Sequence, residues 1–237
     1  MSDPTLLDLV ANGTLDAHIA ATLWSIADER RSFMTVAIPR FAGKSTVSAG
    51  ILKFASPDTS IHMLSGEKAQ MDELAGRPDG GYLVVGEFSR APVDTYIWGA
   101  RVRKVFETVA AGFSLVTALH APTVEEAYAK ICSGNAVSDE DASVIQYMVY
   151  IERHGKSEED FWRRISAVWE VEKVVDGVPV ARLLHRWNEN TDTFEVINGP
   201  QLLNADTALI QARAGKIRSL VETGQTSTTD IEALIAG

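Results

Sequence analysis

The 237-residue sequence contains little cysteine and no long apolar run. Its single cysteine, Cys132, excludes an internal disulfide and argues against a cysteine-based zinc site. No apolar stretch approaches the roughly 20 residues that a helix needs to cross a bilayer. The first residues also lack the basic flank and apolar block of a signal peptide. We therefore expect a chain without a transmembrane segment that works in the cytoplasm, with the inner face of the cell membrane as an alternative peripheral location.

Basic residues are also scarce. Lysine and arginine total 22 against 32 aspartate and glutamate residues, which gives a formal net charge of −10. Nucleic acids and anionic membrane surfaces both reward clustered cations, so we expect no direct binding of nucleic acid. Hydrophobic residues make up 46% of the chain, enough for a full core and too many for a disordered protein.

Apolar strand-like runs alternate with helical segments over the first 140 or so residues. Alternation of this kind predicts an α/β fold with a mainly parallel sheet that is covered by helices on both faces. We expect an N-terminal helical region over 5–31, interrupted near Gly13, then strands over 33–38, 60–64, 82–85 and 113–119, and helices over 45–55, 69–75, 95–110 and 123–131.

After residue 143 the pattern becomes strand-rich. Runs over 144–152, 165–175, 178–187 and 193–197 read as strands, and Asp176-Gly177 is a hairpin-turn signal. Residues 205–237 predict a helical tail. We therefore divide the chain into an N-terminal helical segment (1–30), an α/β domain (31–204) and a C-terminal helical tail (205–237).

The most informative motif is Gly43-Lys44-Ser45-Thr46, which lies between an expected strand and an expected helix. This context is typical of a phosphate-binding loop, in which backbone N–H groups and a lysine hold phosphates and a serine hydroxyl holds Mg²⁺. The pattern G-x-x-x-x-G-K-[ST] is incomplete, because Ile38 occupies the first glycine position and Phe41 replaces a mid-loop glycine. The motif predicts that the phosphates of a nucleotide and Mg²⁺ bind here, with Ser45 on the metal and the nucleotide bound by Arg40, Phe41, Ala42, Gly43, Lys44, Ser45 and Thr46.

Two further polar residues follow buried strands. Glu87 comes after the run 82–85, and His120 comes after the run 113–119. The carboxyl ends of parallel strands line the ligand crevice of open α/β sheets. A carboxylate there can orient water for attack on a γ-phosphate, and a histidine can donate to a phosphate oxygen. Taken singly, each has an ordinary structural explanation, but three polar groups at three strand ends favour a functional site.

The order of these motifs resembles the type II/type IV secretion ATPase family, which powers pilus assembly and secretion. The resemblance lies in Arg77-Pro78-Asp79, in the stretch 83–88 with its Gly86-Glu87 pair, and in the stretch 111–121 with its Leu119-His120 pair, and it covers about residues 30–200. It implies a RecA-like P-loop core that hydrolyses ATP, with Glu87 as the Walker B carboxylate and His120 as the histidine-box residue. Glu67 is the candidate for the family's acidic box.

The same resemblance implies partners. Members act as hexameric rings beside other subunits of a secretion or pilus machine, which here would include an inner-membrane platform protein or a paralogous ATPase. Residues 1–30 are too short for the family's N-terminal domain, so we expect a monomer or weak oligomer that needs a partner to form a ring. The altered loop leaves two alternatives to an active motor subunit: a non-catalytic structural subunit, and a slow nucleotide switch.

Overall fold

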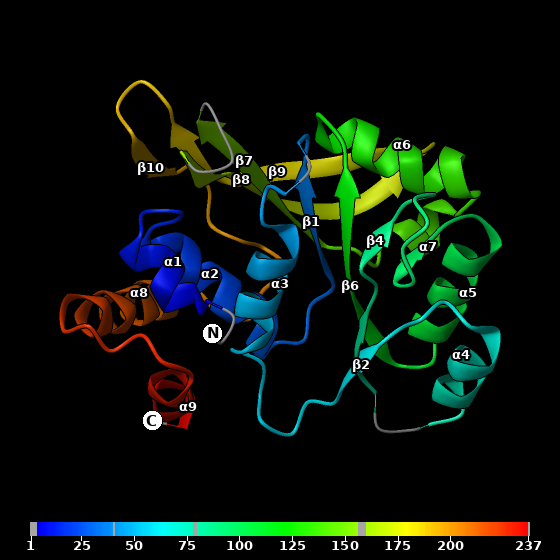
Figure 1. Ribbon diagram of the computed structural model, residues 1–237, viewed down its shortest axis with the longest axis horizontal. Coiled ribbons are helices and arrows are strands. Elements are labelled where there is room, and N and C mark those ends of the chain that lie inside the picture. Colours follow the sequence, from blue (N-terminus) through cyan, green and yellow to red (C-terminus); the bar gives the residue numbers. More distant parts are fainter. Residues whose placement is uncertain (1–3, 40, 78–79, 156–159, 237) are drawn as a thin grey trace.

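An eight-stranded sheet forms the centre of the protein in the computed structural model, which describes residues 4–39, 41–77, 80–155 and 160–236 (Figure 1). The strand order is β10-β9-β8-β7-β1-β6-β3-β2. The pairs β7-β1, β1-β6, β6-β3 and β3-β2 are parallel, and β7, β8, β9 and β10 pair antiparallel. The strands are β1 (Phe33–Ala37), β2 (Ile61–Met63), β3 (Gly81–Val84), β6 (Phe113–His120), β7 (Tyr147–Gly155), β8 (Phe161–Val175), β9 (Val178–Asn188) and β10 (Thr193–Val196).

Helices cover both faces of the sheet. One hydrophobic core joins the sheet to α1 (Leu6–Ala11), α2 (Ala17–Asp28), α3 (Lys44–Leu52), α8 (Thr207–Glu222) and α9 (Thr228–Ala236). A second core, on the other face, joins it to α4 (Lys68–Ala75), α5 (Ala100–Val109), α6 (Val124–Asn135) and α7 (Asp139–Ala142). The α/β class, the mainly parallel sheet, the strand-rich C-terminal part and the helical tail are therefore confirmed.

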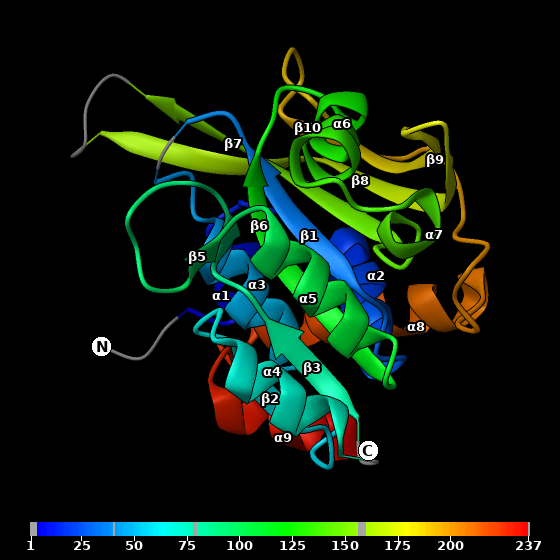
Figure 2. The same cartoon turned by 90° about the vertical axis from the view of Figure 1, so that its right-hand side faces the viewer.

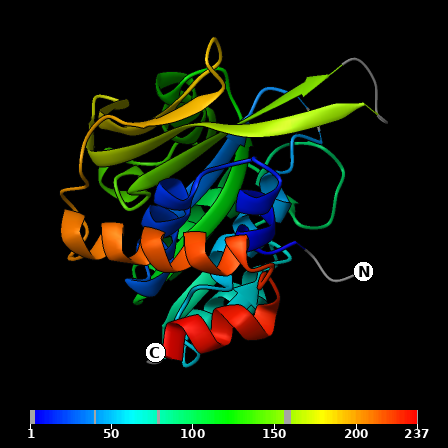
Figure 3. The same cartoon turned by 90° about the vertical axis from the view of Figure 1, so that its left-hand side faces the viewer.

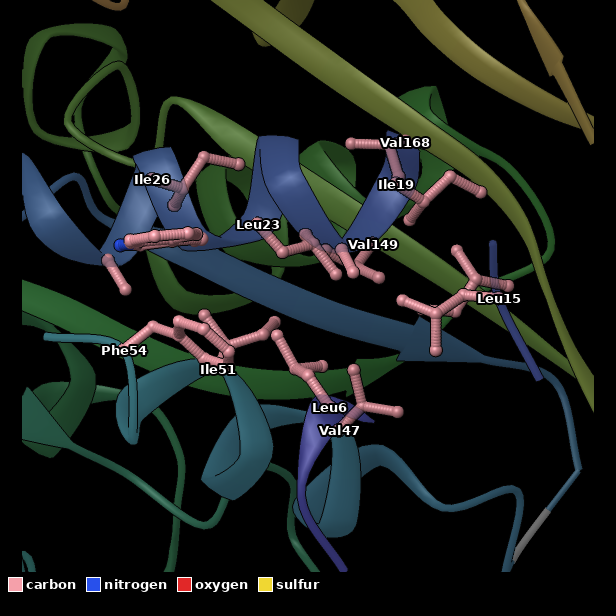
Figure 4. Close-up of a cluster of buried hydrophobic side chains, with 14 of the residues drawn as sticks. Leu6, Leu15, Ile19, Leu23, Ile26, Val47, Ile51, Phe54, Val149 and Val168 are labelled. Carbon is pink, nitrogen blue, oxygen red and sulfur yellow. The ribbon is translucent and has the colours of Figure 1, made fainter. Parts of the chain in front are cut away.

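The N-terminal helices pack into the first core because their sequence places apolar residues on one side. Ile19, Leu23 and Ile26 of α2 recur at helical spacing and are fully buried beside α3 and the sheet (Figure 4). Burial of each such side chain contributes about 1.5–3 kcal/mol. Asp16 begins α2, since its Oδ1 accepts a hydrogen bond from the backbone N–H of Ile19 at 2.8 Å. α8 lies across α2 (Figure 3), so the two ends of the chain share one core and the three-segment division stays a prediction.

The antiparallel strands form a long ribbon. Asp176 and Gly177 join β8 to β9 with φ values of 52° and 74°, the positive angles that a two-residue hairpin turn requires. At its other end the β7-β8 hairpin projects beyond the parallel strands and passes over the loop that follows β1 (Figure 2). This projection brings the start of β8, with Arg163, to the carboxyl end of the sheet.

The expectation of a helix over 95–110 is wrong at its start. Residues Tyr96–Ile97 form β5, which pairs with β4 (Glu87–Phe88), and α5 begins only at Ala100. A helix cannot run through Gly99, because its φ is +68°. The N–H of Gly99 instead donates to Asn135 Oδ1 at 2.6 Å. The sequence pattern does not predict strands β4 and β5 or the short helix α7, because segments this short show no periodicity. Within the described ranges, no helix has the length and apolar character that spanning a membrane demands.

Candidate functional site

The loop between β1 and α3 makes its tight turn at Phe41 and Gly43. Their φ values are +59° and +96°, and Ile38 is not among the residues with positive φ, in agreement with the limits on a β-branched side chain. Gly43 is the N-cap of α3 and supplies no side-chain cap, so N–H groups of the first helical turn remain available to an anion. Ala42 is buried, whereas Ile38 and Phe41 are 63% and 76% exposed. Arg40 lies outside the described residues.

Lys44, Glu87 and His120 meet at the carboxyl end of the sheet. The distance from Lys44 Nζ is 3.2 Å to Glu87 Oε2 and 2.7 Å to His120 Nε2. His120 Nε2 and Glu87 Oε2 are 3.4 Å apart. The strand register explains the meeting, because Ala37 at the end of β1 pairs directly with His120 at the end of β6, and β3 lies on the other side of β6. The structure thus brings together the three strand-end groups that the sequence singled out.

The hydrogen bonds of His120 fix its tautomer. Its Nδ1 lies 3.0 Å from the carbonyl oxygens of both Ala37 and Ile38, so Nδ1 carries the hydrogen and donates it. Nε2 is then left as the acceptor for the Lys44 ammonium. Lys44 therefore has two partners, the His120 ring nitrogen and the Glu87 carboxylate.

The Lys44 ammonium is nearly enclosed. The side chains of Lys44 and Glu87 are 9% and 5% exposed. Burial lowers the pKa of Lys44, and the neighbouring Glu87 carboxylate opposes that change. Lys44 and Glu87 therefore form a buried ion pair, in which loss of either charge would leave the other buried and unpaired.

The other predicted residues lie at different distances from this cluster. Ser45 is exposed and Thr46 half-buried on the first turn of α3. Glu67 is the exposed N-cap of α4 and lines a surface hollow together with Arg101. In the described part of the chain no hydrogen bond or ion pair joins Glu67 to Lys44, Glu87 or His120. The structure therefore does not bring Glu67 into the cluster.

The described residues contain no group of three or more histidine, cysteine, aspartate or glutamate side chains that could hold a metal ion by themselves. Mg²⁺ does not require such a cage, because it usually takes one or two protein oxygens and completes its shell with phosphates and water. The Ser45 hydroxyl at the start of α3 fits this role, next to an N-cap glycine that leaves the helix end open.

Sequence reasoning missed Arg163. Its Nη2 donates to the carbonyl oxygen of Phe41 at 3.1 Å, across 122 residues of sequence. A basic residue in a strand carries no signal of its own, and only the hairpin geometry brings Arg163 to the loop.

The sequence matches no protein-family model and no curated protein. Solved structures similar to this chain include the VirB11 ATPase from the Brucella suis type IV secretion system in complex with sulphate. It is 14% identical, covers 64% of this chain and has a TM-score of 0.45. The ATPase DotB of Legionella pneumophila is 13% identical over 92% of this chain with a TM-score of 0.41, and that of Yersinia pseudotuberculosis is 9% identical over 94% with a TM-score of 0.44. The match spans 52% of the length of the first of these chains and 63% of the other two.

Proposed function

We propose that the protein binds Mg-ATP at the loop between β1 and α3 and hydrolyses it as a motor subunit of a pilus-assembly or secretion machine. The observation that carries the proposal is the Lys44-Glu87-His120 cluster beside the uncapped start of α3. A cation that neutralises phosphate charge and a carboxylate that orients the nucleophile are recurring parts of phosphoryl-transfer sites, and both lie here at one helix N-terminus. The motor context is supported by the order of the sequence motifs.

Each residue has a role that follows from its position. Lys44 would neutralise phosphate charge, and arrival of that charge would release Glu87 from its present ion pair. The freed Glu87 carboxylate could then orient a water molecule and accept its proton. His120, fixed through Nδ1, would sense the terminal phosphate through Lys44, whose ammonium donates to His120 Nε2. Mg²⁺, held by Ser45, would supply charge neutralisation of the phosphates when bound.

One observation favours a second candidate, a non-catalytic structural subunit. Ile38 and Phe41 expose large apolar side chains on the loop itself, at 63% and 76%. Contiguous apolar patches on a surface mark contacts with another protein, and two large apolar side chains within one loop could form part of such a patch. In this alternative the loop is an assembly surface, and the Lys44-Glu87 pair is a permanent part of the structure.

Thermal unfolding and calorimetry with Mg-ATP separate the two candidates. Binding to the native state raises the melting temperature, so wild type should shift and Lys44→Ala should not. Lys68→Ala is a matched control, because Lys68 is a lysine with 77% side-chain exposure on α4. If Mg-ATP neither raises the melting temperature of wild type nor produces heat in calorimetry, the proposal of a nucleotide site is wrong. Binding without phosphate release, with partner subunits present, would favour the structural subunit.

A further inference from the structure

Arg163 of β8 lies directly against the loop between β1 and α3. Besides the hydrogen bond from its Nη2 to Phe41, its side chain occupies the space beside Gly43: a Cβ built at Gly43 would lie 3.0 Å from Arg163 Nε and 3.1 Å from Cδ. Figures 2 and 3 both show this loop running beside the projecting β7-β8 hairpin. The absence of a side chain at Gly43 therefore makes room for the arginine as well as for the turn.

The guanidinium of Arg163 has no charged partner among the described residues. Its neighbours on the ribbon are paired, since Arg164 binds Asp192 at 2.8 Å and Arg186 binds Glu195 at 2.6 Å. Arg163 Nε is buried and has no hydrogen-bond partner in the described part of the structure. Burial, and then the nearby Arg153, lower the pKa of Arg163. A buried donor on a cation without an anion is a costly arrangement, which an incoming anion would relieve.

The side chain is also held in place. The Arg163 guanidinium carbon lies 4.4 Å from the centroid of the Phe161 ring, which Arg153 approaches to 4.7 Å. This stacking and the bond to the Phe41 carbonyl restrict the guanidinium before any ligand arrives. A restricted cation loses less conformational entropy on binding an anion than a free one does.

Charge balance at the loop points to phosphate. Lys44 already has Glu87 as its counterion, so among the residues that the structure describes here, the positive charge without a counterion belongs to Arg163. The planar fork of an arginine matches the oxygens of a phosphate group and can bind two of them at once. The loop also lacks one backbone donor, because Pro39 has no N–H.

We propose that Arg163 is a phosphate-binding residue of the nucleotide site, supplied by the β7-β8 hairpin of the same chain. It binds the polyphosphate of a nucleoside triphosphate and replaces donors that the altered loop lacks. This inference rests on the proposed function, because it needs a nucleotide at the loop.

Calorimetric titration with Mg-ATP tests the assignment in four variants. Arg163→Gln should weaken binding about 10- to 100-fold, the effect of losing one charge-assisted hydrogen-bond partner. Arg163→Lys keeps the charge and the apolar stem but loses the planar fork, so it should fall in between. Arg186→Gln is the matched control, since it removes the same charge from an exposed, ion-paired arginine on β9 and should stay within about twofold of wild type. Lys44→Ala should abolish binding and serves as the reference for complete loss of the site.

The outcomes separate this inference from the proposed function. If Lys44→Ala abolishes binding while Arg163→Gln binds as tightly as Arg186→Gln, Arg163 is not a phosphate ligand and the proposed function stands. If wild type does not bind Mg-ATP at all, both fail. Melting temperatures without nucleotide show whether Arg163→Gln is folded. Should it unfold, Arg163→Lys decides: weaker binding than wild type supports the assignment, and equal binding overturns it.

Discussion

Glu87→Gln should destabilise the nucleotide-free protein and slow the proposed ATP hydrolysis. The substitution keeps size and polarity but removes the charged partner of a lysine that is 9% exposed. Removing one member of a buried ion pair typically costs about 3–5 kcal/mol, because the other charge stays buried and unpaired. His120 Nε2 remains 2.7 Å from Lys44 Nζ as a hydrogen-bond partner, which reduces the cost. We therefore expect a loss of about 3 kcal/mol, or roughly 6–12 °C in melting temperature for a chain of this size.

The pH dependence of this loss provides an internal check. Burial lowers the pKa of Lys44 in the folded state, so the unfolded chain binds more protons at this site between the folded and the unfolded pKa. Stability at this site therefore rises with pH in that interval. Without Glu87 to oppose the effect of burial, Glu87→Gln should recover part of its loss at alkaline pH, more than wild type gains over the same interval.

The assay is urea denaturation without nucleotide, followed by phosphate release with Mg-ATP. The double variant Lys44→Met with Glu87→Gln removes both charges of this buried pair and should recover most of the lost stability. Phosphate release should fall about 100-fold or more in Glu87→Gln, the scale expected when a general base is lost. A Glu87→Gln protein as stable as wild type would refute the buried pair, and unchanged turnover would remove Glu87 from the mechanism.

Three further predictions concern the loop, the core and the assembly. Gly43→Ala should destabilise the protein by about 1–2 kcal/mol because of the positive φ of Gly43. In thermal unfolding the loss should exceed that of the control Gly224→Ala, because Gly224 also has a positive φ but has nothing within 4 Å of an added Cβ. Equal losses in the two variants would argue against the contact with Arg163. Burial, with a smaller effect of His18, lowers the pKa of His185 to about 4. Since the unfolded chain then binds the proton first, stability should fall by about 3 kcal/mol as the pH drops from 6.5 towards 4. When denaturation is measured at both pH values, His185→Gln should lose about 3 kcal/mol less stability than wild type between them. The same pH dependence in wild type and variant would contradict a buried, neutral His185. Light scattering should find the isolated chain mainly monomeric with and without Mg-ATP, whereas a stable hexamer at micromolar concentration would be the opposite result.

The candidate site was partly readable from the sequence. Lys44, Glu87 and His120 each follow an apolar run, and the end of a parallel strand is a position that a pattern can predict. Glu67 also follows a strand, but it is the N-cap residue of α4 at the surface and lies outside the cluster. The conformation of the turn after a strand determines the direction of the side chain, and the sequence pattern does not predict that conformation. The catalytic roles of Glu87, His120 and Glu67 and the phosphate-binding role of Lys44 remain predictions.

The sequence by itself determined the alternation of strands and helices, the hairpin at Asp176-Gly177 and the glycine turn at Gly43, because periodicity and backbone preferences act over a few residues. Only the tertiary structure decided which distant groups touch. The contact of Lys44 with His120 spans 76 residues and that of Arg163 with Phe41 spans 122. Such contacts depend on sheet order and on how far a hairpin projects, which are properties of the whole packed chain and leave no local pattern.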